Sequence, residues 1–128
     1  MRFSVYYHSP ESGEYLRRIV YASGMGQLEQ FHDLSDLASE TGADVVLVEY
    51  QEDNPRLDRW IARTTSSLHS PEVFLFFKEA SVQTIWKGLS LGARQCFAAD
   101  IQPEDFQAAV YRAGTRNRIP RRKRAVCH

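Results

Sequence analysis

Two side chains in this sequence could carry acid–base chemistry, the imidazole of His8 and the carboxylate of Glu49. Glu49 ends an apolar run of four residues, 45–48, and His8 directly follows the apolar and aromatic stretch 2–7. A carboxylate inside a buried strand is costly unless it is paired or lies at the strand's exposed end. An imidazole titrates near neutrality and can exchange a proton with a carboxylate. One hypothesis is therefore a small enzyme or ligand-binding protein that uses this pair, and two polar loop residues are the alternative.

Other motifs for cofactor or metal binding do not occur in the sequence. Gly24 and Gly26 follow a predicted helix and not a strand, so they do not form a phosphate-binding glycine loop. Neither Cys96 nor Cys127 has a partner at the spacing of a zinc site. Cys127 and His128 could bind a metal together, but an unliganded terminus is much commoner. We expect no cofactor, no metal and no enzyme activity, with Cys96 as a small buried apolar residue.

Basic residues gather at the carboxyl-terminal end of the chain. Lysine plus arginine and aspartate plus glutamate number 16 each, so the formal net charge is zero. Seven of the basic residues lie from Arg112 onward, where no acidic residue occurs, which leaves residues 1–111 with a charge of −7. The densest basic run consists of Arg121, Arg122, Lys123 and Arg124. We predict a domain over residues 1–113 and a basic tail over 114–128. The tail could contact nucleic acid or an anionic membrane, or be a solvated interdomain linker, since it lacks aromatic residues for base stacking.

The composition is typical of one compact globular domain. The chain has 128 residues, of which 43% are hydrophobic and 25% are charged. No apolar run approaches the roughly 18 residues that a membrane span needs, and the amino-terminal residues lack the apolar core of a signal peptide. We therefore expect a cytoplasmic protein without a membrane span.

Strand and helix patterns alternate along the chain. Apolar and β-branched runs indicate five strands, at residues 2–7, 27–31, 43–48, 73–77 and 95–98. Helical spacing and capping residues indicate five helices, at residues 11–21, 34–38, 55–61, 82–89 and 103–113. Such alternation forces parallel pairing with right-handed crossovers. We predict an α/β fold with a doubly wound, five-stranded parallel sheet of flavodoxin-like strand order 2-1-3-4-5. Its functional crevice lies beyond the carboxyl ends of the first and third strands, where Tyr7, His8 and Glu49 are found.

Three stretches in order resemble the CheY-like receiver domain of two-component response regulators over residues 2–113. RFSVYYHSPESGEYLRR (2–18) resembles the first strand, the acidic loop and the helix start of a receiver, and DVVLVE (44–49) resembles the strand that ends at the phosphoryl-accepting aspartate. PEVFLFFKEASVQTIWKGLSLGARQCFAAD (71–100) is similar to the fourth strand, the fourth helix and the fifth strand. The resemblance implies a signalling module that acts through its surface.

The residues that receivers use for phosphorylation are replaced in this sequence. The two metal-binding acids correspond to Tyr7 and His8, the phosphoryl acceptor to Glu49, the hydroxyl residue to Phe77 and the lysine to Ala99. Mg²⁺ needs hard oxygen ligands, including carboxylates, which Tyr7 and His8 do not supply. Without the metal and the lysine, the charge of a transferring phosphoryl group is not neutralised. The resemblance therefore implies an atypical, phosphorylation-independent receiver.

Two interpretations remain open for each of Glu49 and His8 if the chain is an atypical receiver. Glu49 could be a fixed mimic of the phosphorylated state, although it carries one negative charge and a phosphoryl group carries nearly two. It could also be a loop acid that is solvated or hydrogen-bonded to Tyr7 or His8. His8 could be a proton-linked switch or a polar loop residue.

The resemblance also implies an interaction face. Receivers dimerise or dock partners through surfaces that correspond here to residues 81–89, 95–98 and 104–113. Trp86 is either a core anchor or an interface hot spot, and the residues for the polar rim are Lys87, Arg94, Asp105 and Arg112. Among receivers without the acidic pocket, the chain is similar to the amino-terminal domain of TadZ/CpaE-type pilus assembly ATPases, which help to place pilus and secretion machinery at the cell pole. The alternative is a degenerate receiver of a transcriptional regulator that contacts DNA through the basic tail.

Overall fold

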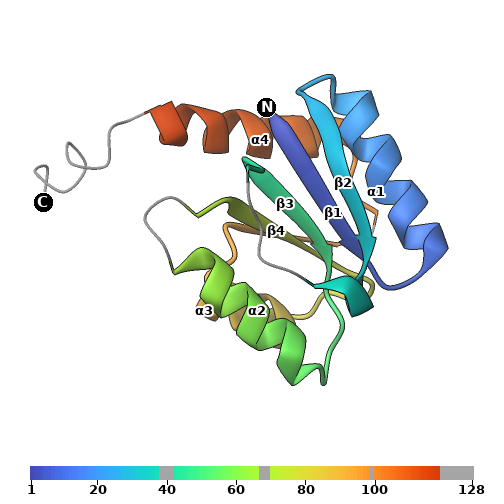
Figure 1. The fold of residues 1–128 in the computed structure, drawn as a ribbon, viewed down its shortest axis with the longest axis vertical. Coiled ribbons are helices and arrows are strands. Elements are labelled where there is room, and N and C mark those ends of the chain that lie inside the picture. The colour runs from blue at the N-terminus through green and yellow to red at the C-terminus, as the bar shows by residue number, and fades with distance from the viewer. Residues whose placement is uncertain (38–41, 67–69, 99, 119–128) are drawn as a thin grey trace, which may run out of the picture.

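The computed structural model of the chain describes residues 1–37, 42–66, 70–98 and 100–118, the residues from 114 onward through their backbone only. A five-stranded parallel sheet lies at its centre, and its strand order is β2-β1-β3-β4-β5 (Figure 1). The strands are β1 (Arg2–Tyr7), β2 (Gln27–Asp33), β3 (Val45–Glu49), β4 (Glu72–Phe77) and β5 (Gln95–Ala98). The predicted fold class and strand order are confirmed.

Helices cover both faces of the sheet. Figure 1 shows α1 (Pro10–Ser23) and α4 (Pro103–Arg118) on one face, and α2 (Pro55–Thr65) and α3 (Val82–Ser90) on the other. The first three helices begin at side-chain caps that accept a backbone N–H, Ser9, Asn54 and Ser81. Among the described residues, no helix is both long enough and apolar enough to cross a bilayer.

The central strands are buried on both faces of the sheet, which explains their continuous apolar runs. Alternate side chains along each strand enter opposite layers. Towards α1 and α4 the strands contribute Phe3, Val5, Val45, Leu47, Phe74 and Phe76. Towards α2 and α3 they contribute Tyr6, Val46, Val48, Val73, Leu75 and Phe77. Each layer is thus filled mainly by aromatic and branched side chains, and Ser4 within β1 is a buried polar exception.

The segment after β2 differs from the prediction. The expected helix at 34–38 is replaced by a single 3₁₀ turn, η1 (Leu34–Asp36), and residues 38–41 lie outside the described part of the chain. The Asp33 carboxylate accepts a hydrogen bond from the Ser35 amide at 2.9 Å. This bond lowers the pKa of Asp33 and caps the short turn. The described part of the chain therefore has four α-helices where five were predicted, and β2 runs two residues further than predicted.

The carboxyl-terminal helix also runs further than its predicted end. α4 continues to Arg118, so the first residues of the predicted tail prolong the helix. The remaining tail, which contains Arg121, Arg122, Lys123 and Arg124, lies outside the described residues. The boundary between domain and tail, and contact of the tail with nucleic acid, stay predictions.

Candidate functional site

Glu49 lies at the carboxyl end of β3, and its side chain reaches across to the loop after β1. One carboxylate oxygen, Oε1, accepts hydrogen bonds from the backbone amides of His8 at 2.7 Å and of Ser9 at 3.1 Å. Ser9 is in turn the N-cap of α1. Bonds from N–H groups to an ionised acceptor are among the stronger hydrogen bonds in proteins. Glu49 therefore fixes the connection between β1 and α1.

The Glu49 side chain contacts the backbone of His8 and not its imidazole ring. The carboxylate binds the His8 amide, whereas the ring atom Nε2 of His8 lies 3.5 Å from the side-chain nitrogen of Gln51. The topology brings the two residues together as predicted, but their contact holds a loop. A proton exchange between imidazole and carboxylate has no support in this arrangement.

Tyr7 corresponds to the first of the two metal-binding acids of a receiver, and in this chain its side chain packs against other residues. Its ring centroid lies 4.6 Å from that of Phe31 on β2. The ring also lies so close to Gly13 that a Cβ atom there would come within 2.8 Å of its Cγ. Only a glycine fits opposite this ring, so α1, β1 and β2 are packed together around it.

Phe77 fills the place where a receiver carries a hydroxyl group. Its side chain is 2% exposed, and its ring centroid lies 5.2 Å from that of Tyr50. Ala99, the predicted replacement for the receiver lysine, lies outside the described residues. In the described part of the chain, no group of three histidine, cysteine, aspartate or glutamate side chains could hold a metal ion. The rings of Phe77 and Tyr50 thus pack together where a receiver carries its hydroxyl residue.

Two cavities open above these residues, with volumes of about 530 and 300 Å³. Both are lined by His8, Glu49, Phe77 and Lys78. Sequence reasoning missed Lys78, which places a cation at the end of β4. The available signal was its position directly after an apolar strand, the same signal that singled out Glu49.

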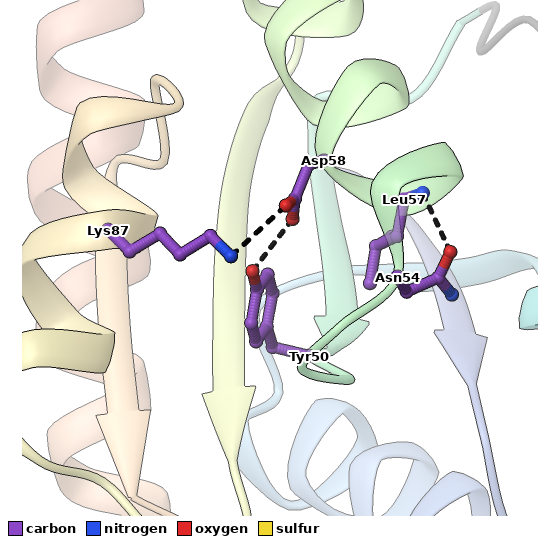
Figure 2. A network of polar contacts seen from close by, with 5 residues as sticks. All are labelled: Tyr50, Asn54, Leu57, Asp58 and Lys87. Carbon is purple, nitrogen blue, oxygen red and sulfur yellow. Dashed lines mark hydrogen bonds and ion pairs between the residues drawn. The ribbon is translucent and has the colours of Figure 1, made fainter.

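A polar network joins the end of β3 to the two helices on its face. The Tyr50 hydroxyl donates to Asp58 Oδ1 at 2.7 Å, and Lys87 Nζ lies 3.2 Å from Asp58 Oδ2 (Figure 2). Burial, together with the hydrogen bond to Asp58, raises the pKa of Tyr50 to about 12. The hydrogen bonds to Asp58 and Tyr50 raise the pKa of Lys87. Tyr50 is therefore neutral and Lys87 is charged throughout the physiological pH range. No sequence motif predicted that these residues contact Asp58.

Trp86 lies on the surface, so its interpretation as a core anchor is wrong. The tryptophan is 68% exposed, and Val82 (72%) and Leu89 (46%) on the same helix are exposed too. Their spacing of four and three residues places them along one face of α3. We call Val82, Trp86 and Leu89 the apolar stripe.

The inner face of α3 rests on the sheet through a glycine. Gly88 is buried, and a Cβ atom there would come within 2.9 Å of both Cys96 Sγ and Leu75 Cδ1. Cys96 is half-buried beneath the helix, and burial raises the pKa of its thiol to about 11. The thiol is therefore protonated at neutral pH and acts as a packing group.

The residues predicted for the polar rim fall into two groups. Lys87 and Arg94 already form ion pairs within the chain, with Asp58 at 3.2 Å and with Glu72 at 3.9 Å. Asp105 and Arg112 are exposed on α4, seven residues apart. Residues seven apart lie on the same side of a helix. Their participation in an interface stays a prediction.

Removal of the Glu49 side chain is expected to destabilise the fold. Glu49→Ala should lower the free energy of unfolding by about 1–3 kcal/mol, because the amides of His8 and Ser9 lose their acceptor. Glu49→Gln keeps an acceptor oxygen and should cost less. The matched control is Glu52→Ala, an exposed acid in the same loop region. Urea denaturation followed by circular dichroism measures the difference, and equal stabilities of Glu49→Ala and Glu52→Ala would contradict the anchoring role.

Comparison with known proteins shows likeness in structure. No protein-family model matches the chain, and no curated protein sequence matches it. The signal receiver domain of the response regulator NarL from Mycobacterium tuberculosis superposes with a TM-score of 0.75 at 20% identity, covering 89% of this chain and 95% of that one. A pilus assembly-related protein from Burkholderia pseudomallei superposes with a TM-score of 0.72 at 15% sequence identity, and the match covers 90% of each chain. A CpaE2 pilus assembly protein from Sinorhizobium meliloti superposes with a TM-score of 0.65 at 18% sequence identity, and the match covers 88% of this chain and 99% of that one. The chain has the CheY-like receiver fold.

Proposed function

We propose that the chain is a non-catalytic receiver-like module that self-associates without aspartyl phosphorylation. The observation that carries this proposal is the state of the phosphoryl-acceptor crevice. Glu49 stands at the acceptor position with its Oε1 atom bound to two backbone amides, and the places of a metal-binding acid and of the hydroxyl residue are taken by the packed rings of Tyr7 and Phe77.

The chemistry of phosphoryl transfer supports this proposal. A carboxylate that attacks a phosphoryl group needs free lone pairs and a nearby cation to neutralise the developing charge. Here two backbone amides hold Oε1 of Glu49, which leaves Oε2 as the oxygen that could attack, and the aromatic ring of Phe77 offers a phosphate no hydrogen bond. Lys78 lines the same cavities as a cation, but among the described residues no group of three metal-ligating side chains could hold a metal ion beside it. We infer that Glu49 is a structural anchor of the loop after β1, in preference to an acceptor or a charge mimic.

The β5 edge of the sheet, with α3 on one face and α4 on the other, supports association with a second copy of the chain. Lys87 is the one charged residue within α3, and its charge is compensated by Asp58, so the apolar stripe has no net charge to attract an acidic or basic partner. Asp105 and Arg112 put opposite charges on one side of α4. In a twofold dimer each residue i that contacts j is matched by j contacting i. The acid on α4 of one copy can therefore face the base on α4 of the other copy, and the base of the first can face the acid of the second.

The structural likeness to two pilus assembly proteins favours a role in placing such machinery in the cell. We propose that the dimer serves as a scaffold at a cell pole. A fluorescent fusion of the chain in the source cells is expected to form a polar focus. An even distribution through the cell would contradict this part of the proposal.

Self-association of the unmodified chain tests the proposal. Sedimentation velocity is run over a series of protein concentrations, in buffer that contains EDTA and no phosphoryl donor. We expect a reversible monomer–dimer equilibrium in the micromolar range. A monomer at every concentration would contradict self-association, and a dimer that forms only after addition of Mg²⁺ and a phosphoryl donor would contradict its independence of phosphorylation.

A further inference from the structure

We propose that Tyr50, Asp58 and Lys87 are positioning residues that fix α3, and with it the apolar stripe, in the orientation used for self-association. This inference rests on the proposed function. The three side chains come from three separate elements: Tyr50 follows β3, Asp58 lies in the first turn of α2, and Lys87 lies in the last turn of α3 (Figure 2). The Asp58 carboxylate accepts from both of the others, one on each oxygen.

α3 has few other contacts that could set its position. It is a short helix, Val82–Ser90, and only Gly88 within it is buried, while Thr84 and Ile85 are half-buried. Trp86 and the other two side chains of the stripe are exposed to solvent. Helical stability in proteins comes mainly from packing of an apolar face. A helix that buries so little needs another restraint, and the network supplies one that is directional.

The burial of Asp58 makes the network a stronger restraint than an ordinary surface ion pair. The side chain of Asp58 is 20% exposed, and that of Lys87 is 48% exposed. Exposed ion pairs contribute little because water and salt screen them. A carboxylate that is mostly buried and also accepts a phenol hydroxyl is screened less. Loss of either partner would leave Asp58 with an unmet hydrogen bond.

The network is anchored at the carboxyl end of β3, the central strand of the sheet. The Tyr50 amide donates to the Phe76 carbonyl at 2.8 Å, and its ring packs against Phe77. Tyr50 also directly follows Glu49, whose carboxylate is itself fixed. The position of α3 is thus tied to the end of β3 by constant contacts. A helix held in this way presents one surface at all times, as a phosphorylation-independent module requires.

The test measures the order of α3 and self-association in the same variants. Tyr50→Phe, Asp58→Asn and Lys87→Met each remove one part of the network while keeping the side-chain shape. The matched controls are Tyr21→Phe on α1 and Asp53→Asn before α2, which remove a hydroxyl and a charge elsewhere. Hydrogen exchange is followed by mass spectrometry on the peptides of α3 and α1, at concentrations where the chain is monomeric. Sedimentation gives the dimer dissociation constant.

We expect Asp58→Asn to accelerate exchange of the α3 amides about tenfold and to raise the dimer dissociation constant by about tenfold, with α1 unchanged. Tyr50→Phe added to Asp58→Asn should have little further effect, because both act on one network. Unchanged α3 exchange in Asp58→Asn, or equal acceleration in α1 and α3, would overturn the inference, since the second result describes a general loss of stability. A wild-type chain that never dimerises would overturn the proposed function, while α3 exchange would still decide whether the network positions the helix.

Discussion

Replacement of Trp86 by alanine is expected to weaken self-association by about 2–4 kcal/mol, which is roughly 30- to 1000-fold in the dissociation constant. Trp86 stands in the middle of the apolar stripe and is 68% exposed in the monomer. Buried tryptophans near the centre of an interface are the residues that most often dominate binding energy. The fold should be unaffected, because an exposed side chain contributes little to stability, within about 0.5 kcal/mol.

The control for this variant is Tyr21→Ala on α1. Tyr21 is an aromatic residue of almost equal exposure, 64%, on a helix that covers the opposite face of the sheet. The Tyr21→Ala variant should leave the dimer dissociation constant unchanged. Sedimentation equilibrium of the two variants and the wild type decides between the outcomes. If Trp86→Ala dimerises as well as Tyr21→Ala does, the apolar stripe is not the interface.

Phe77→Thr is expected to lower the free energy of unfolding by about 3–5 kcal/mol. This change restores the residue type that receivers carry at the end of the fourth strand. In this chain the side chain is 2% exposed and packs on the ring of Tyr50. The substitution would leave a cavity and bury a hydroxyl group. The place where a receiver carries its hydroxyl residue belongs here to the core.

Ala98→Thr provides the matched control for Phe77→Thr. Ala98 is paired with Phe77 in the ladder between β4 and β5 and is exposed. The same new side chain should therefore change stability by less than about 0.5 kcal/mol at this position. Urea denaturation measures both variants. A Phe77→Thr chain as stable as the wild type would mean that the crevice has kept room for a hydroxyl group.

The sheet and the location of the crevice could be predicted from the sequence because they depend on local patterns. The apolar runs that became β3 and β4 are too continuous for a half-exposed strand, and this identifies a sheet covered on both faces. Capping residues such as Ser81 and Asn54 mark helix starts through contacts within one turn. Parallel order then places the strand ends, and hence Tyr7, His8 and Glu49, at one edge.

Features that depend on long-range packing could not be predicted. The apolar spacing of Val82, Trp86 and Leu89 is the same for a buried and an exposed helix face. The face that turns inward is set by contacts between residues distant in the sequence, such as the fit of Gly88 on the sheet. Asp58 and Lys87 are 29 residues apart and meet only once α2 and α3 lie side by side. Asp33 caps the 3₁₀ turn η1 as it would cap an α-helix, so this capping residue did not distinguish the two structures in the sequence.

The central claim is that the chain acts without phosphorylation, and beryllofluoride with Mg²⁺ tests it most directly, since this complex mimics a phosphoryl group on the acceptor carboxylate. Nitrogen–proton correlation spectra are recorded during a titration of the wild-type chain, together with sedimentation at each point. We predict no saturable shift of the Glu49, His8 or Ser9 amides and an unchanged dimer dissociation constant. Saturable shifts centred on Glu49, accompanied by tighter self-association, would contradict the account.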